Sequence, residues 1–231
     1  PFWTKLSKYN KFTKKIKIKA PDLKLKIINE FFKKDGDLNN GKNNISIQNS
    51  SINTKYSIKD QTVIFKSDGS NVFNSKINYN GQLAINPFDL NLKIDLYNYK
   101  TSNLFRPNSI INEFIKSGLL FNENINVHTL VNIEYTKKNK IFNKAKLELK
   151  VLNGKISFDK SIFINNSIGS MEIFNSNLFL ENDKLILTAN LSIDIKDIDR
   201  LYSFLSTNKR LRKDIKNIKL NIIYDFLSNE I

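Results

Sequence analysis

The chain has 231 residues and a mass of 26.8 kDa, and its 37 Lys and Arg residues against 22 Asp and Glu residues make a formal net charge of +15. It contains no cysteine and one histidine, which excludes disulfides, thiolate nucleophiles, Cys-based metal sites and multi-His metal centres, so we expect no metal and no cofactor. No apolar stretch approaches the roughly 20 residues that span a bilayer, and no secretory signal pattern is present. Because the chain begins with Pro1, we interpret it as a piece of a longer protein.

The positive charge is concentrated in the first quarter of the chain. Residues 1–66 hold 15 basic and 5 acidic side chains, a net charge of +10, whereas residues 67–231 hold 22 and 17, a net charge of +5. We therefore predict a basic, β-rich N-terminal segment over 1–66 and a second region over 67–231. Lysines at alternate positions, such as Lys15, Lys17 and Lys19, are typical of the solvent face of a strand. Weak attraction to lipid phosphates or anionic headgroups is the functional alternative.

Nucleic acid is not the expected partner. Four of the basic residues are Arg, although bidentate recognition of phosphate and guanine favours the guanidinium group. The sequence has no Gly-rich phosphate loop, zinc finger or aromatic RNP-type motif. A polyanion binder that uses the basic N-terminal segment stays open as a hypothesis, and steep salt dependence of binding is what it requires.

Most of the chain alternates apolar and polar residues with a period of two, which is typical of antiparallel strands with one apolar and one polar face. Several runs extend for about ten residues, longer than the usual strand of five or six. The pattern predicts a mainly β fold: a long, curved antiparallel meander that forms a groove-like sheet with two short helices. The clearest alternating apolar positions are Phe88, Leu90, Leu92, Ile94 and Leu96; Ile125, Val127, Val131, Ile133 and Tyr135; Ala145, Leu147, Leu149 and Val151; Leu185, Leu187, Ala189, Leu191, Ile193 and Ile195; and Ile218, Leu220, Ile222, Tyr224 and Phe226.

Glycines that follow Asn or Asp predict the hairpin turns. Such pairs tolerate the positive φ that a type I′ turn needs at both central residues. Three further polar stretches, Asn165-Asn166, Asn182-Asp183 and residues 137–140, are expected to close hairpins of their own. The Asx-Gly pairs are Asp35-Gly36, Asn40-Gly41, Asp68-Gly69, Asn80-Gly81 and Asn153-Gly154.

Two short amphipathic helices are expected between strands. The first runs over about 108–117, with Asn108 as N-cap and Gly118 as the C-terminal stop. The second follows Asp197 and extends to Leu205, with apolar residues at helical spacing. Each helix has one apolar face, so we expect it to pack on the sheet or to close the end of a groove.

The residues that could carry catalysis have simpler explanations. His128 alternates with the apolar set of its strand, which places it on the opposite, polar face. The acidic residues Asp194, Asp197 and Asp199 fall on the polar side of a strand and at a helix start, where negative charge is favourable. No nucleophile elbow accompanies them. We therefore assign no catalytic residue and expect that the chain is not an enzyme.

The second region resembles a known family. Its characteristic order is a strand, turn and strand over 147–158, the segment 168–173, a long strand over 185–195, a helix over 198–205, the basic turn 209–213 and a last strand over 218–224. This order is similar to the C-terminal region of AsmA-like proteins, and 80–92 resembles the meander that precedes it. The resemblance implies a large envelope protein that is anchored in the inner membrane by a helix outside this chain and projects into the periplasm. Relatives in the wider group with TamB and YhdP are thought to conduct phospholipids toward the outer membrane.

The resemblance implies that the apolar strand faces form the floor of a lipid groove, which takes part in outer-membrane biogenesis or lipid homeostasis through lipid transport. The expected partners are then phospholipid or another membrane lipid and the bacterial envelope membranes, with Lys15, Lys17 and Lys19 meeting headgroups at the rim. A closed β-sandwich with a structural or adhesive role and no lipid ligand is the alternative. The candidate floor residues are Leu90, Leu92, Ile94, Val127, Val131, Leu147, Leu149, Leu187, Leu191, Leu220 and Ile222.

Overall fold

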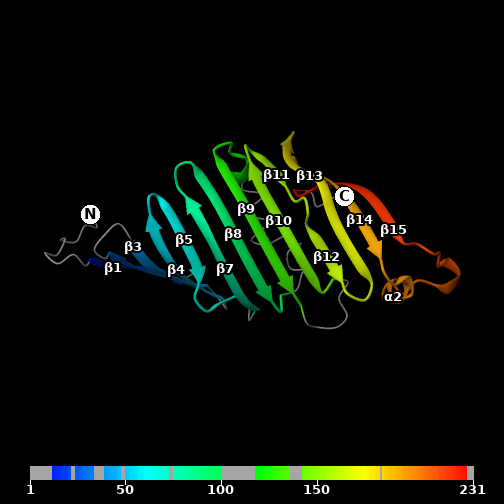
Figure 1. Ribbon diagram of the computed structural model, residues 1–231, viewed down its shortest axis with the longest axis horizontal. Coiled ribbons are helices and arrows are strands. Elements are labelled where there is room, and N and C mark those ends of the chain that lie inside the picture. The colour runs from blue at the N-terminus through cyan, green and yellow to red at the C-terminus, as the bar shows by residue number, and fades with distance from the viewer. Residues whose placement is uncertain are drawn as a thin grey trace. The chain divides into compact units, whose positions relative to one another are not determined.

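The computed structural model describes residues 12–21, 24–33, 39–47, 50–72, 75–99, 118–135, 142–182 and 184–227. Over these residues the chain is mainly β: a 15-stranded sheet, mostly antiparallel, is accompanied by one α-helix and short 3-10 turns (Figure 1). This confirms the predicted fold class. No helix in the described ranges has both the length and the apolar character that a membrane span needs. The chain divides into two compact units, Pro1–Leu96 and Tyr97–Ile231, which are described in turn.

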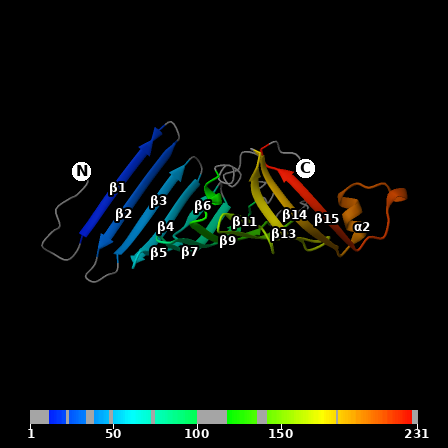
Figure 2. The same ribbon diagram turned by 90° about the horizontal axis from the view of Figure 1, so that it is seen from above.

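The first unit is a run of antiparallel hairpins in which strand order follows chain order (Figure 2). The order is β1-β2-β3-β4-β5-β7-β8, and the short β6 pairs with β4 and β7. The predicted boundary at residue 66 falls inside β5, so it stays a division by charge. The strands are β1 (Phe12–Ala20), β2 (Leu25–Lys33), β3 (Asn39–Ile47), β4 (Ser50–Lys59), β5 (Thr62–Ser67), β6 (Ser70–Val72), β7 (Ser75–Ala84) and β8 (Phe88–Tyr97).

Two predicted hairpin turns of the first unit are wrong, because their glycines lie inside strands. Gly41 is directly opposite Tyr56, and Gly81 is directly opposite Phe65. A Cβ atom on Gly41 would collide with the Tyr56 ring, and one on Gly81 would lie 2.6 Å from Phe65 Cζ. Each of these glycines therefore makes room for an aromatic ring from the neighbouring strand. Pairs of an aromatic residue and a glycine on adjacent strands stabilise β-sheets in other proteins as well.

The other Asx-Gly pairs have mixed outcomes. Asn153-Gly154 forms the expected turn between two paired strands, with φ of 50° and 70°. Asp68-Gly69 is not a hairpin turn: it joins β5 to β6, and both of these strands pair with the same neighbours, β4 and β7. Asp35-Gly36 and residues 137–140 lie outside the described residues. The β4–β5 hairpin instead turns at Asp60-Gln61, with φ of 48° and 62°, a pair that the glycine pattern did not single out.

In the second unit the strand order is β9-β10-β11-β13-β14-β15, and the short β12 pairs with β10 and β13. The predicted turn at Asn165-Asn166 connects β12 to β13. Of the predicted turn Asn182-Asp183, Asn182 directly follows β13, and Asp183 lies outside the described residues. The elements are η3 (Leu119–Phe121), β9 (Ile125–Glu134), β10 (Lys144–Leu152), β11 (Lys155–Ser157), β12 (Ile162–Asn165), β13 (Gly169–Glu181), β14 (Lys184–Ile195), α2 (Ile198–Phe204), η4 (Lys209–Leu211) and β15 (Asn217–Asp225).

The predicted second helix is present as α2, and its start has the expected cap. The Asp197 carboxylate accepts a hydrogen bond from the Arg200 backbone N–H at 3.0 Å. It also forms an ion pair with the Arg200 side chain at 3.1 Å. Tyr202 is the buried residue of α2, and its hydroxyl donates to the Lys213 carbonyl oxygen at 2.6 Å. This bond ties the helix to the segment that leads into β15. The predicted helix over 108–117 lies outside the described residues.

Candidate functional site

Apolar side chains of the second unit form continuous rows across the sheet, because directly paired residues lie on the same face. Two such rows each cross six strands, and each residue in a row is directly opposite the next one. This places the apolar alternation of every strand on one common face. The rows are Val127, Val151, Ile156, Leu178, Leu187 and Tyr224, and Ile133, Ala145, Phe163, Met171, Ile193 and Ile218.

The exposure of this face increases toward the C-terminal strands. In the first row Val151, Ile156 and Leu178 are 2%, 0% and 1% exposed, whereas Leu187 and Tyr224 are half-buried. The second row follows the same trend, from fully buried side chains in β9, β10 and β12 to half-buried ones in β13, β14 and β15. Within these two rows the more accessible side chains therefore lie on the last strands. The trend does not hold at every position, because Val131, Leu147 and Leu149 on β9 and β10 are half-buried, whereas Leu185 and Ala189 on β14 are 1% and 3% exposed.

Four of the predicted floor residues come together on β14 and β15. Leu191 is directly opposite Leu220. The next position on this face pairs Ile222 with the buried Ala189, and Leu187 follows Ala189 on β14. Leu220 is 44% exposed, and the other three are half-buried. We call this set, with its neighbours, the C-terminal apolar surface. It consists of Leu187, Leu191, Ile193, Ile218, Leu220 and Ile222.

The remaining predicted floor residues belong to two other groups. On β9 and β10 Val131 is opposite Leu147, Val127 is opposite Val151, and Leu149 is opposite Thr129, so the sequence pattern placed them on the correct face. In the first unit Leu90, Leu92 and Ile94 are opposite Leu83, Gly81 and Tyr79, and all three are half-buried. The predicted floor residues are thus apolar-face residues in both units.

The predicted rim lysines lie on the polar face of β1. Because Ile16 and Ile18 point to the apolar face, Lys15, Lys17 and Lys19 point to the other, and all three are exposed. Lys15 forms an ion pair with Glu30 on β2 at 2.7 Å. The hydrogen bond and charge of Lys15 lower the pKa of the Glu30 carboxyl, and Lys42 adds to this effect.

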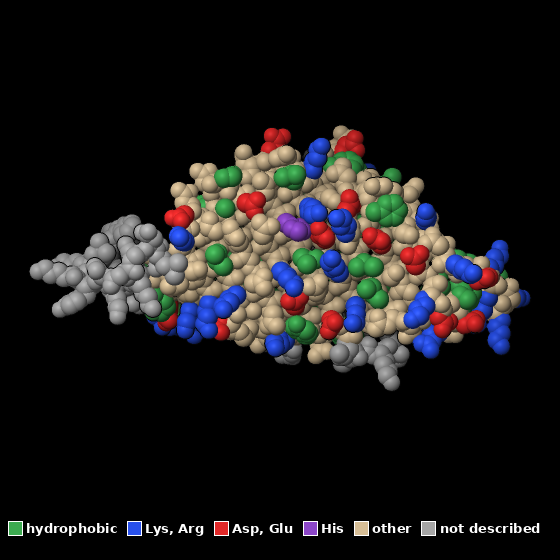
Figure 3. Space-filling view, viewed as in Figure 1, with side chains coloured by type: hydrophobic (Ala, Val, Ile, Leu, Met, Phe, Trp, Pro, Cys, Tyr) green, Lys and Arg blue, Asp and Glu red, His purple; other side chains and the backbone are tan. Residues whose placement is uncertain are grey.

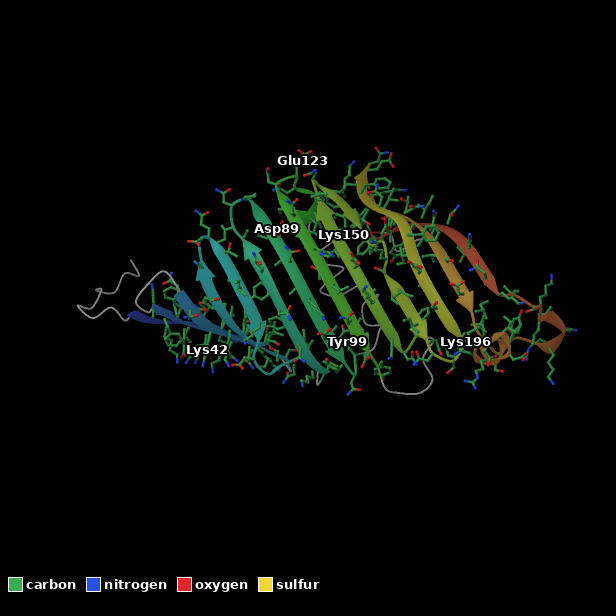
Figure 4. All side chains as sticks on the ribbon, viewed as in Figure 1. Lys42, Asp89, Tyr99, Glu123, Lys150 and Lys196 are labelled. Carbon is green, nitrogen blue, oxygen red and sulfur yellow. The ribbon has the colours of Figure 1, made fainter. Side chains whose placement is uncertain are left out.

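A charged cluster occupies the polar face of β9 and β10, and it contains His128, as the alternation predicted. The Glu148 carboxylate lies 2.9 Å from Lys150 Nζ and 3.1 Å from His128 Nε2. Figure 3 shows the histidine on the face where Figure 4 labels Lys150. The Glu148 side chain is 11% exposed, so its charge needs these partners. The hydrogen bond from Lys150, helped by that from His128, lowers the pKa of Glu148 despite its burial.

Replacing Glu148 with Gln should change the acid sensitivity of the fold. Because the folded state lowers this pKa, Glu148 contributes stability above its unfolded pKa, and the contribution disappears as the pH falls through the folded value. We expect Glu148→Gln to cost about 1–2 kcal/mol at pH 7 and progressively less below about pH 4.5. Urea unfolding between pH 3 and pH 7 measures this difference. The exposed Glu172→Gln is the control, and a cost that does not vary with pH would contradict the assignment.

The centre of the second unit contains a polar interruption that the sequence pattern did not reveal. Between β11 and β12 the chain leaves the ladder, and the Ser161 hydroxyl bonds both the backbone N–H and the carbonyl oxygen of Glu148, at 3.0 and 3.3 Å. Next to it, the Asp159 carboxylate accepts from the backbone N–H and the hydroxyl of Ser176, each at 2.6 Å, where β13 bulges. Side chains thus replace missing ladder bonds, and this role is structural.

The acidic residues near α2 also have structural partners. Asp197 caps the helix, Asp199 lies in its first turn, and Asp194 accepts a hydrogen bond from the Asn217 side chain at 2.5 Å. Among the residues that the structure describes, no group of three or more His, Cys, Asp or Glu side chains is arranged to hold a metal ion.

Comparison of the chain with protein-family models, with curated proteins and with solved structures finds no match. The resemblance to AsmA-like proteins therefore stays a prediction.

Proposed function

We propose that the chain binds the acyl chains of membrane lipids on the C-terminal apolar surface. The observation that supports this most directly is the accessible pairing of Leu191 with Leu220, beside Leu187 and Ile222, in the middle of paired strands. Accessible apolar side chains on two paired strands are typical of interaction sites. Shielding a lipid chain of about 16 carbons from water is worth on the order of 12 kcal/mol, at roughly 0.8 kcal/mol per methylene.

The proposed mechanism is passive. The apolar side chains hold the acyl chain by dispersion and by exclusion of water, and no residue needs to act as an acid, base or nucleophile. Combined with the AsmA-like order of elements, this function belongs in the periplasm, in a protein anchored to the inner membrane by a segment outside this chain. The proposed role is lipid transport or lipid homeostasis between the envelope membranes.

Charged substitutions on the C-terminal apolar surface should abolish lipid binding. We expect lipid to co-purify with the wild type and to be absent from Leu191→Asp and Leu220→Asp, because a carboxylate beside an acyl chain is desolvated without a partner. Mass spectrometry of extracted lipids measures the loss. The matched control is Ile223→Asp, since Ile223 is 64% exposed on the opposite face of β15. Lipid retained in folded Leu191→Asp and Leu220→Asp protein would refute the proposal.

A closed structural module is the second candidate, and one observation favours it. The apolar face of β9 to β12 has fully buried members, with Ile156 at 0% and Phe163 at 1% exposure, as in an ordinary core. In this case native mass spectrometry of the wild type would find no bound lipid, and the Leu191 and Leu220 variants would lose stability without losing a ligand.

A further inference from the structure

Five lysines form a row across the polar face of the first unit. The row is made of directly paired residues on seven neighbouring strands, from β1 to β8. Neighbouring strands lie about 4.8 Å apart, so the row is roughly 29 Å long. Its members are, in strand order, Lys15, Glu30, Lys42, Lys55, Lys66, Asn80 and Lys93. We call it the lysine row.

The row has an excess of positive charge that the protein does not neutralise. Lys42, Lys55 and Lys66 lie directly opposite one another on three successive strands, an arrangement of like charges that destabilises a sheet. Two carboxylates offset it in part: Glu30 lies 2.7 Å from Lys15, and Asp68 lies 2.8 Å from Lys55.

The described residues give Lys42, Lys66 and Lys93 no ion pair, and all three are exposed. Figure 3 shows Lys and Arg side chains gathered where Figure 4 labels Lys42.

We propose that the lysine row binds a flexible, linear phosphate polymer that lies across the strands. The ammonium group of lysine binds phosphate as a point charge and does not depend on the planar, bidentate geometry that arginine uses. One positive charge on each of three successive strands suits a chain that carries a charge on every repeat. The positions beside the row include amides and hydroxyls. Ser57 and Gln82 can donate hydrogen bonds to phosphate oxygens, whereas the side-chain amides of Asn44 and Asn53 already donate to Asn53 and Gly69.

The single-file arrangement favours a linear chain over a flat membrane. Neighbouring strands of a sheet are rotated by about 20° relative to each other, so the side chains of a seven-strand row fan through roughly 120° around the axis of the row. A flat anionic bilayer meets only part of such a fan, whereas a flexible polymer can follow it. Single-stranded nucleic acids are usually bound through aromatic side chains on which their bases stack. Phe32 is the aromatic side chain beside the described row, so we expect the surface to recognise the phosphates of a polymer and not its bases.

Binding of linear inorganic polyphosphate, long enough to span about 29 Å, tests the proposal. Titration calorimetry at several NaCl concentrations compares the wild type with the variant Lys42→Gln, Lys55→Gln, Lys66→Gln. We expect the affinity of this variant to fall by about tenfold or more, and the slope of log K against log salt to fall by about 2, since each contacted phosphate contributes roughly 0.7. Its melting temperature should stay close to that of the wild type, because the loss of like-charge repulsion offsets the loss of the exposed Lys55–Asp68 ion pair.

The matched control changes the net charge equally but leaves the row intact. Lys155→Gln, Lys184→Gln, Lys219→Gln replaces three exposed lysines of the second unit, and it should bind polyphosphate like the wild type. If both triple variants bind polyphosphate more weakly by the same factor, the loss of affinity comes from net charge alone, and the proposal is overturned. It would also be overturned by equally tight binding of orthophosphate, or by binding to phosphatidylglycerol vesicles without binding to polyphosphate.

Discussion

Replacing Phe163 with Ala should lower the free energy of unfolding by about 3–5 kcal/mol. Phe163 is 1% exposed and lies between Ala145 and Met171 on the neighbouring strands. Its ring also packs against Phe142, with ring centroids 5.4 Å apart. Truncation removes the buried ring and leaves a cavity that small Ala145 cannot fill. Urea unfolding followed by circular dichroism measures the change.

The comparison with an exposed residue makes this prediction specific. Ile223 is 64% exposed on β15, so Ile223→Ala should change the free energy of unfolding by about 0.5 kcal/mol or less. Similar costs for the two variants would show that the face of β9 to β12 is not a packed core. That outcome would also remove the burial gradient from which the C-terminal apolar surface was identified.

Strand positions in this chain are predictable because their signal is local. The alternation from Leu185 to Ile195 coincides with β14, and that from Ala145 to Val151 lies within β10. The same local logic located α2, where Asp197 precedes apolar residues at helical spacing and caps the first turn. Each of these signals depends on residues within one strand or one helix.

The misplaced turns show where local signals fail. Asn40-Gly41 and Asn80-Gly81 have the composition of a hairpin turn, yet each glycine is fixed in a strand by an aromatic residue about 15 positions away. The steric need for glycine comes from the Tyr56 and Phe65 rings, which only the register brings opposite. A dipeptide pattern cannot distinguish a glycine that turns from one that makes room.

The candidate surfaces were predictable in the same partial way. Period two identified the apolar residues of β9 and β15 equally well, but Val127 is 9% exposed and Leu220 is 44% exposed. The difference depends on what covers each strand, which a strand's own sequence does not encode. The lysine row is still less visible, because Lys42, Lys55 and Lys66 are 11 to 13 residues apart and become neighbours only through strand pairing.

Gly169 is the position where we expect the severest effect of adding one methyl group. It begins β13 with φ of 150° and lies directly opposite Asn165 and Ile195. A Cβ atom there would collide with the backbone carbonyl oxygen of Asp194, which cannot rotate away as a side chain could. Relief of the collision requires β13 and β14 to separate at this end of the ladder. Gly169→Ala should therefore cost about 3 kcal/mol or more.

Gly69→Ala separates the effect of backbone conformation from that of the collision. Gly69 has φ of 75°, but a Cβ atom there would meet nothing within 4 Å. We expect this variant to lose about 1–2 kcal/mol, the cost of left-handed backbone alone. The excess cost of Gly169→Ala, measured by urea unfolding of both variants, then reports the contact with the Asp194 carbonyl. Equal losses would mean that β13 and β14 do not approach as closely as the structure shows, and the register that aligns Met171 with Ile193 beside them would lose its support.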